Sequence, residues 1–184
     1  MAKLVYVTNV SVDGYIEDTQ GDFGWSEPSD EYMRFITDLV RPVGTFLYGR
    51  RLYESMAVWE TDAALAAESE LSADFAGVWQ AADKIVYSTT LHDVSTARSR
   101  IERRFDPDSV RDIKASAERD LAVGGSILAG HAIDAGLVDE CQLFVHPVVV
   151  GGGKPAFRSA VDLALLETRR FDCGVVYLRY RTRT

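Results

Sequence analysis

A strand, a glycine turn and a helix in immediate succession, between residues 121 and 135, constrain the fold of this chain more than any other feature. The apolar run at residues 121–123 meets the pair Gly124 and Gly125, and a helical pattern over residues 126–135 starts at once. Unpaired backbone N–H groups and the positive end of the helix dipole converge at such a point and suit a phosphate group. Glycine also lets the main chain approach an anion closely. An ordinary tight turn is the alternative interpretation.

The hydrophobic pattern predicts strands that alternate with helices along the whole chain. Strands are expected at residues 3–10, 43–48, 84–88, 121–123, 140–150, 163–171 and 175–180. Helices are expected at residues 30–40, 65–82, 110–119 and 126–135, a short helix ends near residue 56, and loops are expected at residues 11–25 and 93–107. This alternation indicates a single α/β domain, residues 1–184, with a mixed, mostly parallel sheet and an antiparallel C-terminal strand pair.

Composition and charge argue against several classes of function. The net charge of −8 at pH 7 disfavours general nucleic-acid binding, which needs a basic face. No apolar run approaches the roughly 20 residues that span a bilayer, and the N-terminal residues lack the plan of a signal peptide, so we expect a cytoplasmic protein without a membrane partner. We interpret Cys141 and Cys173 as reduced core residues, and no Cys-x-x-Cys or His-x-x-x-His spacing indicates a metal site.

Four blocks of sequence, taken in their order and spacing, resemble the dihydrofolate reductase fold and, within it, the RibD C-terminal family of riboflavin-biosynthesis reductases. They are Ser-Val-Asp-Gly-Tyr-Ile at residues 11–16, Leu-Tyr-Gly-Arg-Arg-Leu-Tyr-Glu-Ser at 47–55, Val-Tyr-Ser-Thr-Thr-Leu at 86–91, and the segment from the glycine pair to Gly-Gly-Gly-Lys-Pro-Ala-Phe at 151–157. The resemblance covers nearly the whole chain. It implies a three-layer α/β fold with helices on both faces of the sheet, NADPH, a small-molecule substrate, and a homodimer whose interface includes the strand at residues 141–150 and the C-terminal strand pair.

The same resemblance implies residues for the adenosine and phosphate parts of NADPH. Gly49, Arg50 and Arg51 would lie along the phosphates, and Ser88 and Thr89, with Thr90 as a further candidate, would meet the adenosine ribose phosphate. Gly124 and Gly125, helped by the backbone N–H groups of Ser126 and Ile127, would hold the pyrophosphate, often through a cis peptide at the glycine pair. A solvated surface pair is the alternative for the two arginines, and a strand-end turn is the alternative for Ser88 and Thr89.

The first block would form the nicotinamide and substrate side of the site. Val10 and Ile16 would contact the cofactor, and Asn9, at the end of the first strand, would contact the substrate. Trp25 resembles an active-site tryptophan of the reductases, with a plain core anchor as the alternative. Two carboxylic acids are candidates for the proton donor. Asp13 alternatively serves an Asp-Gly turn, and Glu31 alternatively stabilises the first turn of a helix.

The glycine-rich loop at residues 151–157 is expected to contribute to the substrate pocket through Gly153, Lys154 and Phe157, or else to be a flexible hairpin with an exposed lysine. His146 either faces this pocket or is an ordinary hydrogen-bonded strand residue. The His-x-Glu and Pro-Cys-x-x-Cys ligands of a zinc deaminase are absent from the sequence. Three functions therefore compete: a stand-alone riboflavin-type reductase resembling 5-amino-6-(5-phosphoribosylamino)uracil reductase, a dihydrofolate reductase proper, and a non-catalytic NADP(H)-binding protein.

Overall fold

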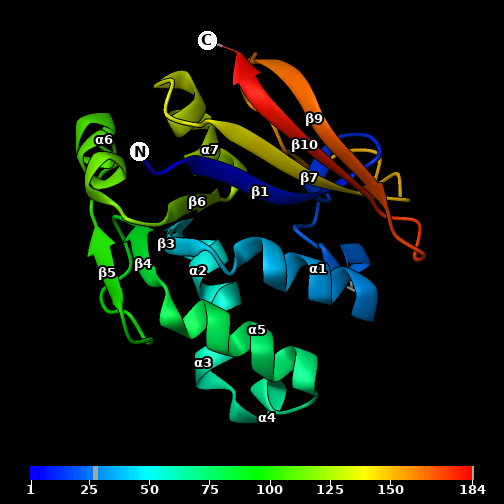
Figure 1. The fold of residues 1–184 in the computed structure, drawn as a ribbon, viewed down its shortest axis with the longest axis horizontal. Helices are drawn as coiled ribbons and strands as arrows, with labels where there is room; N and C mark the ends of the chain where they lie inside the picture. Colours follow the sequence, from blue (N-terminus) through cyan, green and yellow to red (C-terminus); the bar gives the residue numbers. More distant parts are fainter. Residues whose placement is uncertain (27–28, 184) are drawn as a thin grey trace.

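The central sheet has eight strands and is mixed but mostly parallel, as the sequence predicts (Figure 1). The computed structural model describes residues 1–26 and 29–183. The strands are β1 (Leu4–Ser11), β3 (Val43–Gly49), β4 (Asp83–Tyr87), β5 (Ser99–Glu102), β6 (Asp120–Gly124), β7 (Glu140–His146), β9 (Asp162–Arg170) and β10 (Val176–Arg183). Their order is β5-β4-β3-β6-β1-β7-β10-β9, and only the pairings of β10 with β7 and β9 are antiparallel.

Helices cover both faces of this sheet and complete a three-layer fold (Figure 1). The α-helices are α1 (Asp30–Val40), α2 (Arg50–Met56), α3 (Val58–Thr61), α4 (Ala63–Ala66), α5 (Glu70–Ala81), α6 (Pro107–Ser116) and α7 (Ser126–Asp134). On one face α5 buries Trp79 against Phe46 of β3. On the other face α7 packs Ala129 and Ala132 against Leu4 and other residues of β1. Burial of two apolar sheet faces by separate helices therefore holds the three layers together.

Side-chain caps explain where the helices begin and why the predicted helix at residues 65–82 is divided. Ser29 caps α1 by accepting a hydrogen bond from the Tyr32 N–H. Asp62 caps α4, and Ser69 caps α5 by accepting from the Ser72 N–H. Because Ser69 satisfies the start of a new helix, the segment is not continuous, and the prediction of one long helix is wrong.

The predicted loop at residues 93–107 contains a strand that the sequence pattern does not reveal. Lys84 to Tyr87 of β4 pair in parallel with residues of β5, which lies at the edge of the sheet. Its side chains are charged or half-exposed, because β5 has a strand neighbour on only one side among the described residues. The predicted loop at residues 11–25 likewise contains β2 (Tyr15–Glu17), which pairs with β8 (Lys154–Pro155), and the short 3-10 helix η1 (Gly24–Ser26).

Two further predictions need correction near the end of the chain. β7 ends at His146 rather than at residue 150, because Pro147 follows and has no N–H to continue the ladder. Cys141 is buried in β7 as predicted, but Cys173 is exposed in the turn between β9 and β10.

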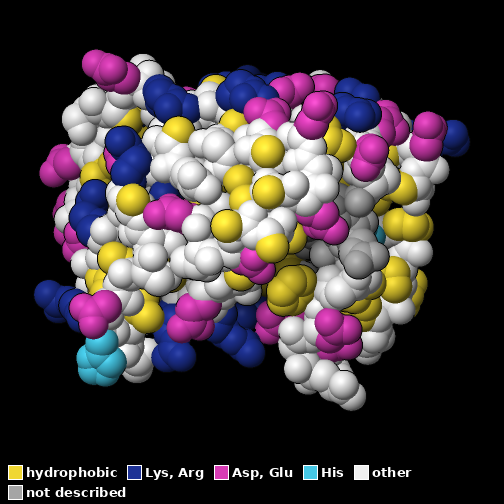
Figure 2. Space-filling model, turned by 90° about the horizontal axis from the view of Figure 1, so that it is seen from below, with side chains coloured by type: hydrophobic (Ala, Val, Ile, Leu, Met, Phe, Trp, Pro, Cys, Tyr) yellow, Lys and Arg dark blue, Asp and Glu magenta, His cyan; other side chains and the backbone are white. Residues whose placement is uncertain are grey.

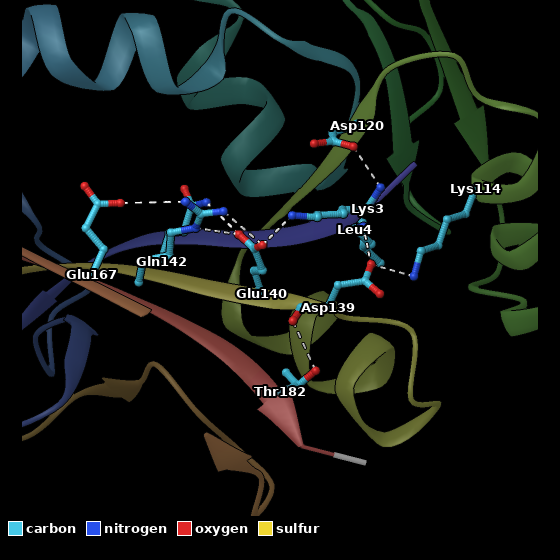
Figure 3. Close-up of polar contacts among 10 residues, drawn as sticks. Lys3, Leu4, Lys114, Asp120, Asp139, Glu140, Gln142, Glu167 and Thr182 are labelled. Carbon is cyan, nitrogen blue, oxygen red and sulfur yellow. Dashed lines mark hydrogen bonds and ion pairs between the residues drawn. The ribbon is translucent and has the colours of Figure 1, made fainter. Parts of the chain in front are cut away.

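Paired charges tie the N-terminal ends of the parallel strands together (Figure 3). The Glu140 carboxylate accepts hydrogen bonds from Lys3 Nζ at 2.7 Å and from Arg179 Nε at 2.8 Å. Next to it, Asp139 pairs with Lys114 of α6 at 2.6 Å. Burial alone would raise the pKa of Glu140, but the hydrogen bonds from Arg179 and Lys3 outweigh burial and lower it to about 2. These contacts join β1, β7, β10 and α6 at one end of the sheet.

The surface below the α3–α5 side of the molecule carries charges of both signs. Figure 2 shows Lys and Arg side chains interspersed with Asp and Glu on this face, with scattered hydrophobic side chains between them. Among the described residues, no helix has both the length and the apolar character needed to cross a membrane.

Candidate cofactor and substrate site

The C-terminal ends of four neighbouring parallel strands lie side by side, at the opposite end of the strands from Glu140. We call this the carboxyl edge, or open edge, of the sheet. The order of these strands is β4-β3-β6-β1. The pairing register sets Tyr48 beside Gly124 and Gly49 beside Tyr87. The turns that follow β3, β4 and β6 are therefore adjacent, although they are far apart in the sequence. In open α/β sheets this carboxyl edge is where ligands bind.

The turn between β6 and α7 has the conformation that only glycine adopts readily. Gly125 has φ +85°, and a Cβ added there would meet no atom within 4 Å, so the space above it is open. A Cβ on Gly124 would lie 2.4 Å from Leu52 Cδ2, so close packing against α2 requires the first glycine. No cis peptide occurs in the described part of the chain, and the expectation of one at this pair is wrong. The positive φ of Gly125 turns the chain instead.

The first turn of α7 presents an unusual set of unsatisfied donors. The Ser126 side chain is only 1% exposed, and its hydroxyl has no hydrogen-bond partner among the described residues. Gly125 gives no side-chain cap to the helix, so the first backbone N–H groups are available as well. Ile127 is 48% exposed beside them. A buried hydroxyl without a partner costs free energy, and an anion at this turn would satisfy it together with the backbone groups.

Arg50 bridges the turns that follow β3 and β4. Its Nη1 donates to Thr90 Oγ1 at 3.0 Å and its Nε to Glu54 at 2.9 Å. The Ser88 hydroxyl accepts the Leu91 N–H at 2.9 Å, so Ser88 organises the turn on which the exposed Thr89 and Thr90 lie. The structure thus brings Arg50, Ser88, Thr89 and Gly49 together at one place.

Arg51 points to a different part of the edge. Its guanidinium lies 3.6 Å from the Glu17 carboxylate of β2, and its side chain is 76% exposed. The two adjacent arginines therefore serve two regions, and only Arg50 lies at the end of β4.

The sequence pattern missed Arg103, which braces the turn after β4. Its guanidinium donates to the backbone oxygens of Ser88 at 3.1 Å and Leu91 at 2.6 Å. Beside this turn lies a cavity of about 350 Å³ at the ends of β4 and β5, lined by Tyr87, Ile101, Glu102, Arg103, Arg104, Asp106, Ser109 and Ile113. The only sequence signal was the cluster of arginines at residues 98–104. A second cavity, which includes Arg41 and Arg119, lies away from this edge.

The glycine-rich loop packs against β2 on the far side of the site. A Cβ on Gly153, which has φ +138°, would lie 2.0 Å from the Glu17 backbone oxygen. Lys154 Nζ lies 3.4 Å from the Glu17 carboxylate, and the Phe157 ring packs edge-on against Tyr6 with centroids 5.8 Å apart. The loop is therefore anchored rather than a free hairpin, and Phe157 is partly a packing residue.

Two apolar residues, Val10 just before the first block and Ile16 at its end, pack in this region. Val10 is buried at the end of β1 and packs with Ala156 and Leu143. Ile16 of β2 is half-buried against the same cluster. Their side chains fix where the two backbones meet.

Both candidate proton donors already hold hydrogen bonds. The Asp13 carboxylate accepts the N–H groups of Val150 at 3.2 Å and Gly151 at 2.8 Å. The Ser11 side chain and these backbone groups lower the pKa of Asp13. Glu31 accepts from the Asp172 N–H at 3.2 Å and from Arg169 at 3.0 Å, and both bonds lower its pKa. As arranged, both groups are carboxylates at neutral pH and tether loops.

A buried polar cluster lies where β1, β7 and α1 meet. Asn9 Oδ1 is 2.5 Å from the Tyr32 hydroxyl and 3.1 Å from His146 Nε2. The Trp25 ring packs edge-on against the His146 ring with centroids 5.5 Å apart. Burial lowers the pKa of His146, so the ring is neutral at neutral pH. Trp25 and Asn9 are thus neighbours through His146, while Tyr32 was not singled out from the sequence because its role depends on contacts between distant segments.

Comparison with known proteins places this architecture among riboflavin-biosynthesis domains. The model of the RibD C-terminal domain family matches residues 2–177. The chain is 30% identical over 182 residues to the uncharacterized protein YyaP of Bacillus subtilis (strain 168), covering 97% of this chain and 94% of that protein.

Solved structures share the fold at lower identity. A putative riboflavin biosynthesis protein from Shewanella sp. PV-4 aligns with a TM-score of 0.76 and 19% identity over 100% of both chains. The diaminohydroxyphosphoribosylaminopyrimidine deaminase/5-amino-6-(5-phosphoribosylamino)uracil reductase of Thermotoga maritima aligns with a TM-score of 0.67 and 15% identity, over 99% of this chain and 57% of that one. These likenesses establish the dihydrofolate reductase-like fold, and the match over residues 2–177 shows that the chain belongs to the RibD C-terminal domain family.

Proposed function

We propose that this protein is an NADPH-dependent reductase that transfers a hydride to a small heterocyclic substrate of the 5-amino-6-(5-phosphoribosylamino)uracil type. The observation that carries the proposal is the β6–α7 turn, where a glycine with φ +85°, a buried Ser126 hydroxyl without a described partner and unpaired helix N–H groups converge. This set of donors fits a pyrophosphate. Family membership supports a reductase, because the related Thermotoga protein is named as one.

The neighbouring turns fit the rest of NADPH. Arg50, with Ser88 and Thr89, offers a guanidinium and hydroxyls to a ribose phosphate, and the cavity beside Arg103 and Tyr87 fits the adenosine end. Gly49, at the end of β3, lies between the turns that follow β4 and β6. It has no side chain that would occupy the space between them. A bound NADPH would supply the hydride, and the residues of this chain would orient it and exclude water.

The substrate side is proposed to lie between the end of β1 and the anchored glycine-rich loop. Asn9 and Trp25 line it from the α1 face, and Gly153 and Lys154 approach it through β2. The tethering of Asp13 and Glu31 supports delivery of the proton by solvent rather than by either carboxylate. It also disfavours a dihydrofolate reductase proper, because Glu31 on the first helix is bound to Arg169.

The test is NADPH oxidation with 5-amino-6-(5-phosphoribosylamino)uracil, with dihydrofolate as the parallel substrate. We expect turnover with the pyrimidine and none with dihydrofolate. Turnover with dihydrofolate alone would replace the proposal by the folate enzyme. Tight NADPH binding without oxidation of either compound would favour a non-catalytic NADP(H)-binding protein.

We also propose a homodimer that forms through the C-terminal strand pair, which is one part of the predicted interface. Within the predicted interface, β7 lies between β1 and β10 and has no free edge, so edge-to-edge pairing of two copies falls to the C-terminal strand pair. β9 is the last strand of the described sheet and exposes Leu165 (55%) and Leu166 (46%). Antiparallel pairing of two β9 strands centred on Leu166 would set Asp162 opposite the partner's Arg170. Light scattering should give a dimer mass for the wild type and a monomer mass for Leu166→Glu; equal masses would remove β9 from the interface.

A further inference from the structure

The side chains of Tyr32, Asn9 and His146 form a hydrogen-bonded group on the α1 face of the sheet. Tyr32 comes from α1, Asn9 from β1 and His146 from β7, and register pairs β1 with β7 up to Ser11 and His146. The Asn9 side-chain oxygen is the shared acceptor, at 2.5 Å from the Tyr32 hydroxyl and 3.1 Å from His146 Nε2. Tyr32 and His146 are each 2% exposed, whereas Asn9 is half-exposed. The buried members therefore support one side chain that reaches the open edge.

The two donors fix the orientation of the Asn9 amide. An amide oxygen accepts two hydrogen bonds, and the Tyr32 O–H and His146 Nε2–H supply both. The Asn9 NH₂ group is then directed away from them, and no described residue accepts a hydrogen bond from it. Burial lowers the pKa of His146 and keeps the ring neutral, so one ring nitrogen carries a proton, and the contact with the Asn9 oxygen assigns that proton to Nε2.

Trp25 offers a second unsatisfied donor and, like Asn9, contacts His146. Its ring packs on His146, and its Nε1–H is buried with no acceptor among the described residues. A buried N–H group without an acceptor is costly, and it gains most from a ligand that provides one. Two N–H donors, with no charged partner among the residues that the structure describes, suit a neutral acceptor such as a carbonyl oxygen.

We propose that Asn9 and Trp25 together bind a carbonyl oxygen of the substrate ring, and that Tyr32 and His146 are positioning residues that hold the Asn9 amide in its donor orientation. The inference rests on the proposed reductase function for its reaction, and it assigns to these four residues the recognition of a ring carbonyl in the uracil-type substrate proposed above. In a ring with amino groups in place of the carbonyls, the amino N–H groups would face the N–H groups of Asn9 and Trp25. Such a ring should bind much more weakly.

Ligand binding tests the donor pair without turnover. Diaminouracil and tetraaminopyrimidine, in which amino groups replace both carbonyl oxygens, are titrated into the full-length protein by calorimetry. We expect diaminouracil to bind at least about tenfold more tightly, and Asn9→Ala and Trp25→Phe each to weaken it about tenfold. Equal binding of the two rings, or unchanged binding by both variants, would overturn the proposal.

Three variants separate positioning from folding. His146→Gln keeps a nitrogen donor near the Nε2 position, His146→Leu removes it, and Tyr32→Phe removes only the hydroxyl. The proton–nitrogen NMR signal of the Trp25 indole, identified by its loss in Trp25→Phe, should move on addition of diaminouracil in the wild type and in His146→Gln. It should respond much less in His146→Leu and Tyr32→Phe if those variants are folded. Equal responses in His146→Gln and His146→Leu would show that the hydrogen bond does not position Asn9.

Steady-state kinetics distinguish this inference from the proposed function. If the wild type oxidises NADPH with 5-amino-6-(5-phosphoribosylamino)uracil, His146→Leu should raise KM about tenfold and His146→Gln should restore most of it. If the wild type shows no turnover, the proposed function fails, while the calorimetric and NMR results still decide whether the donor pair exists.

Discussion

At the N-terminal end of the parallel strands, Glu140 meets Lys3 and Arg179, and Asp139 meets Lys114. At the C-terminal end, the Ser126 hydroxyl and the Trp25 indole N–H have no described partner. The first region contains complete ion pairs that join strands, with Gln142 Oε1 as its unsatisfied atom. The C-terminal region contains hydrogen-bond donors that have no acceptor among the described residues. Buried polar groups that are paired within the fold serve its stability, whereas unpaired donors at the carboxyl ends of the strands indicate a ligand.

The largest expected effect is on cofactor binding at the open edge. In Gly125→Ala the new methyl group would enter the open space above the turn, and the residue would be held at φ +85°. We expect NADPH affinity to fall about a hundredfold, or roughly 2.8 kcal/mol. Gly136→Ala is the matched control at the other end of α7, with φ +65° and no atom within 4 Å of the added Cβ. The control should lose comparable stability and keep its NADPH affinity.

Removing a charge at the opposite end should change stability and leave binding intact. Glu140→Gln removes the anion that Lys3 and Arg179 share and leaves Arg179 only Glu167, at 3.7 Å. We expect a loss of about 2 to 3 kcal/mol in the free energy of unfolding, measured with urea. Because the folded-state pKa of Glu140 is lowered to about 2, its contribution is complete above the ordinary carboxyl range and is lost as pH falls toward 2. In Glu140→Gln, the free energy of unfolding should lack the part that the wild type loses as the pH falls toward 2. If folded Glu140→Gln bound NADPH more weakly than the wild type, the N-terminal end of the strands would also affect cofactor binding, which contradicts the assignment of stability and binding to opposite ends.

The two arginines should differ although they are adjacent. Arg50 reaches Thr90 at the end of β4, while Arg51 faces Glu17. We expect Arg50→Ala to weaken NADPH about tenfold and NADH much less, because only NADPH carries the 2′-phosphate. Arg51→Ala should weaken the two cofactors equally and slightly. If both variants lost similar affinity for NADPH and kept their affinity for NADH, both arginines would bind the 2′-phosphate.

The smallest effect is expected at Asp13. Its pKa is lowered by Ser11 and by the backbone of Gly151 and Val150, so it is ionised throughout the range from mildly acidic to neutral pH. Asp13→Asn should reduce kcat/KM only about threefold by loosening the glycine-rich loop, without changing the shape of the pH–rate profile. Loss of an acidic or basic limb in the variant would identify Asp13 as a group that transfers the proton.

The fold was largely predictable because most strands are short apolar runs between helical patterns and turn residues. The segment at residues 121–135 is the clearest case, with strand, turn and helix at the expected places. β5 escaped prediction because Ser99 and Arg100 are polar and give no apolar alternation, although the strand directly follows β4 in the sequence. The division of the helix at Ser69 depends on one capping side chain that propensity does not weigh.

The site was predictable only where a local motif carries it. Gly124, Gly125 and Arg50 stand at strand ends and could be expected at the carboxyl edge. The divergence of Arg51 toward Glu17 depends on the path of a loop, and the meeting of Tyr32 with Asn9 and His146 depends on how α1 crosses two strands. Such contacts join distant segments, so a single sequence contains no pattern that reveals them.

The most direct test is a titration of NADPH and NADH into the wild-type protein, followed by tryptophan fluorescence, with Gly125→Ala and Gly136→Ala measured in parallel. We predict saturable NADPH binding at micromolar concentrations, much weaker NADH binding, and a loss of NADPH binding in Gly125→Ala alone. Absence of NADPH binding in the wild type, or equal affinity in Gly125→Ala, would contradict the assignment of the open edge as a cofactor site.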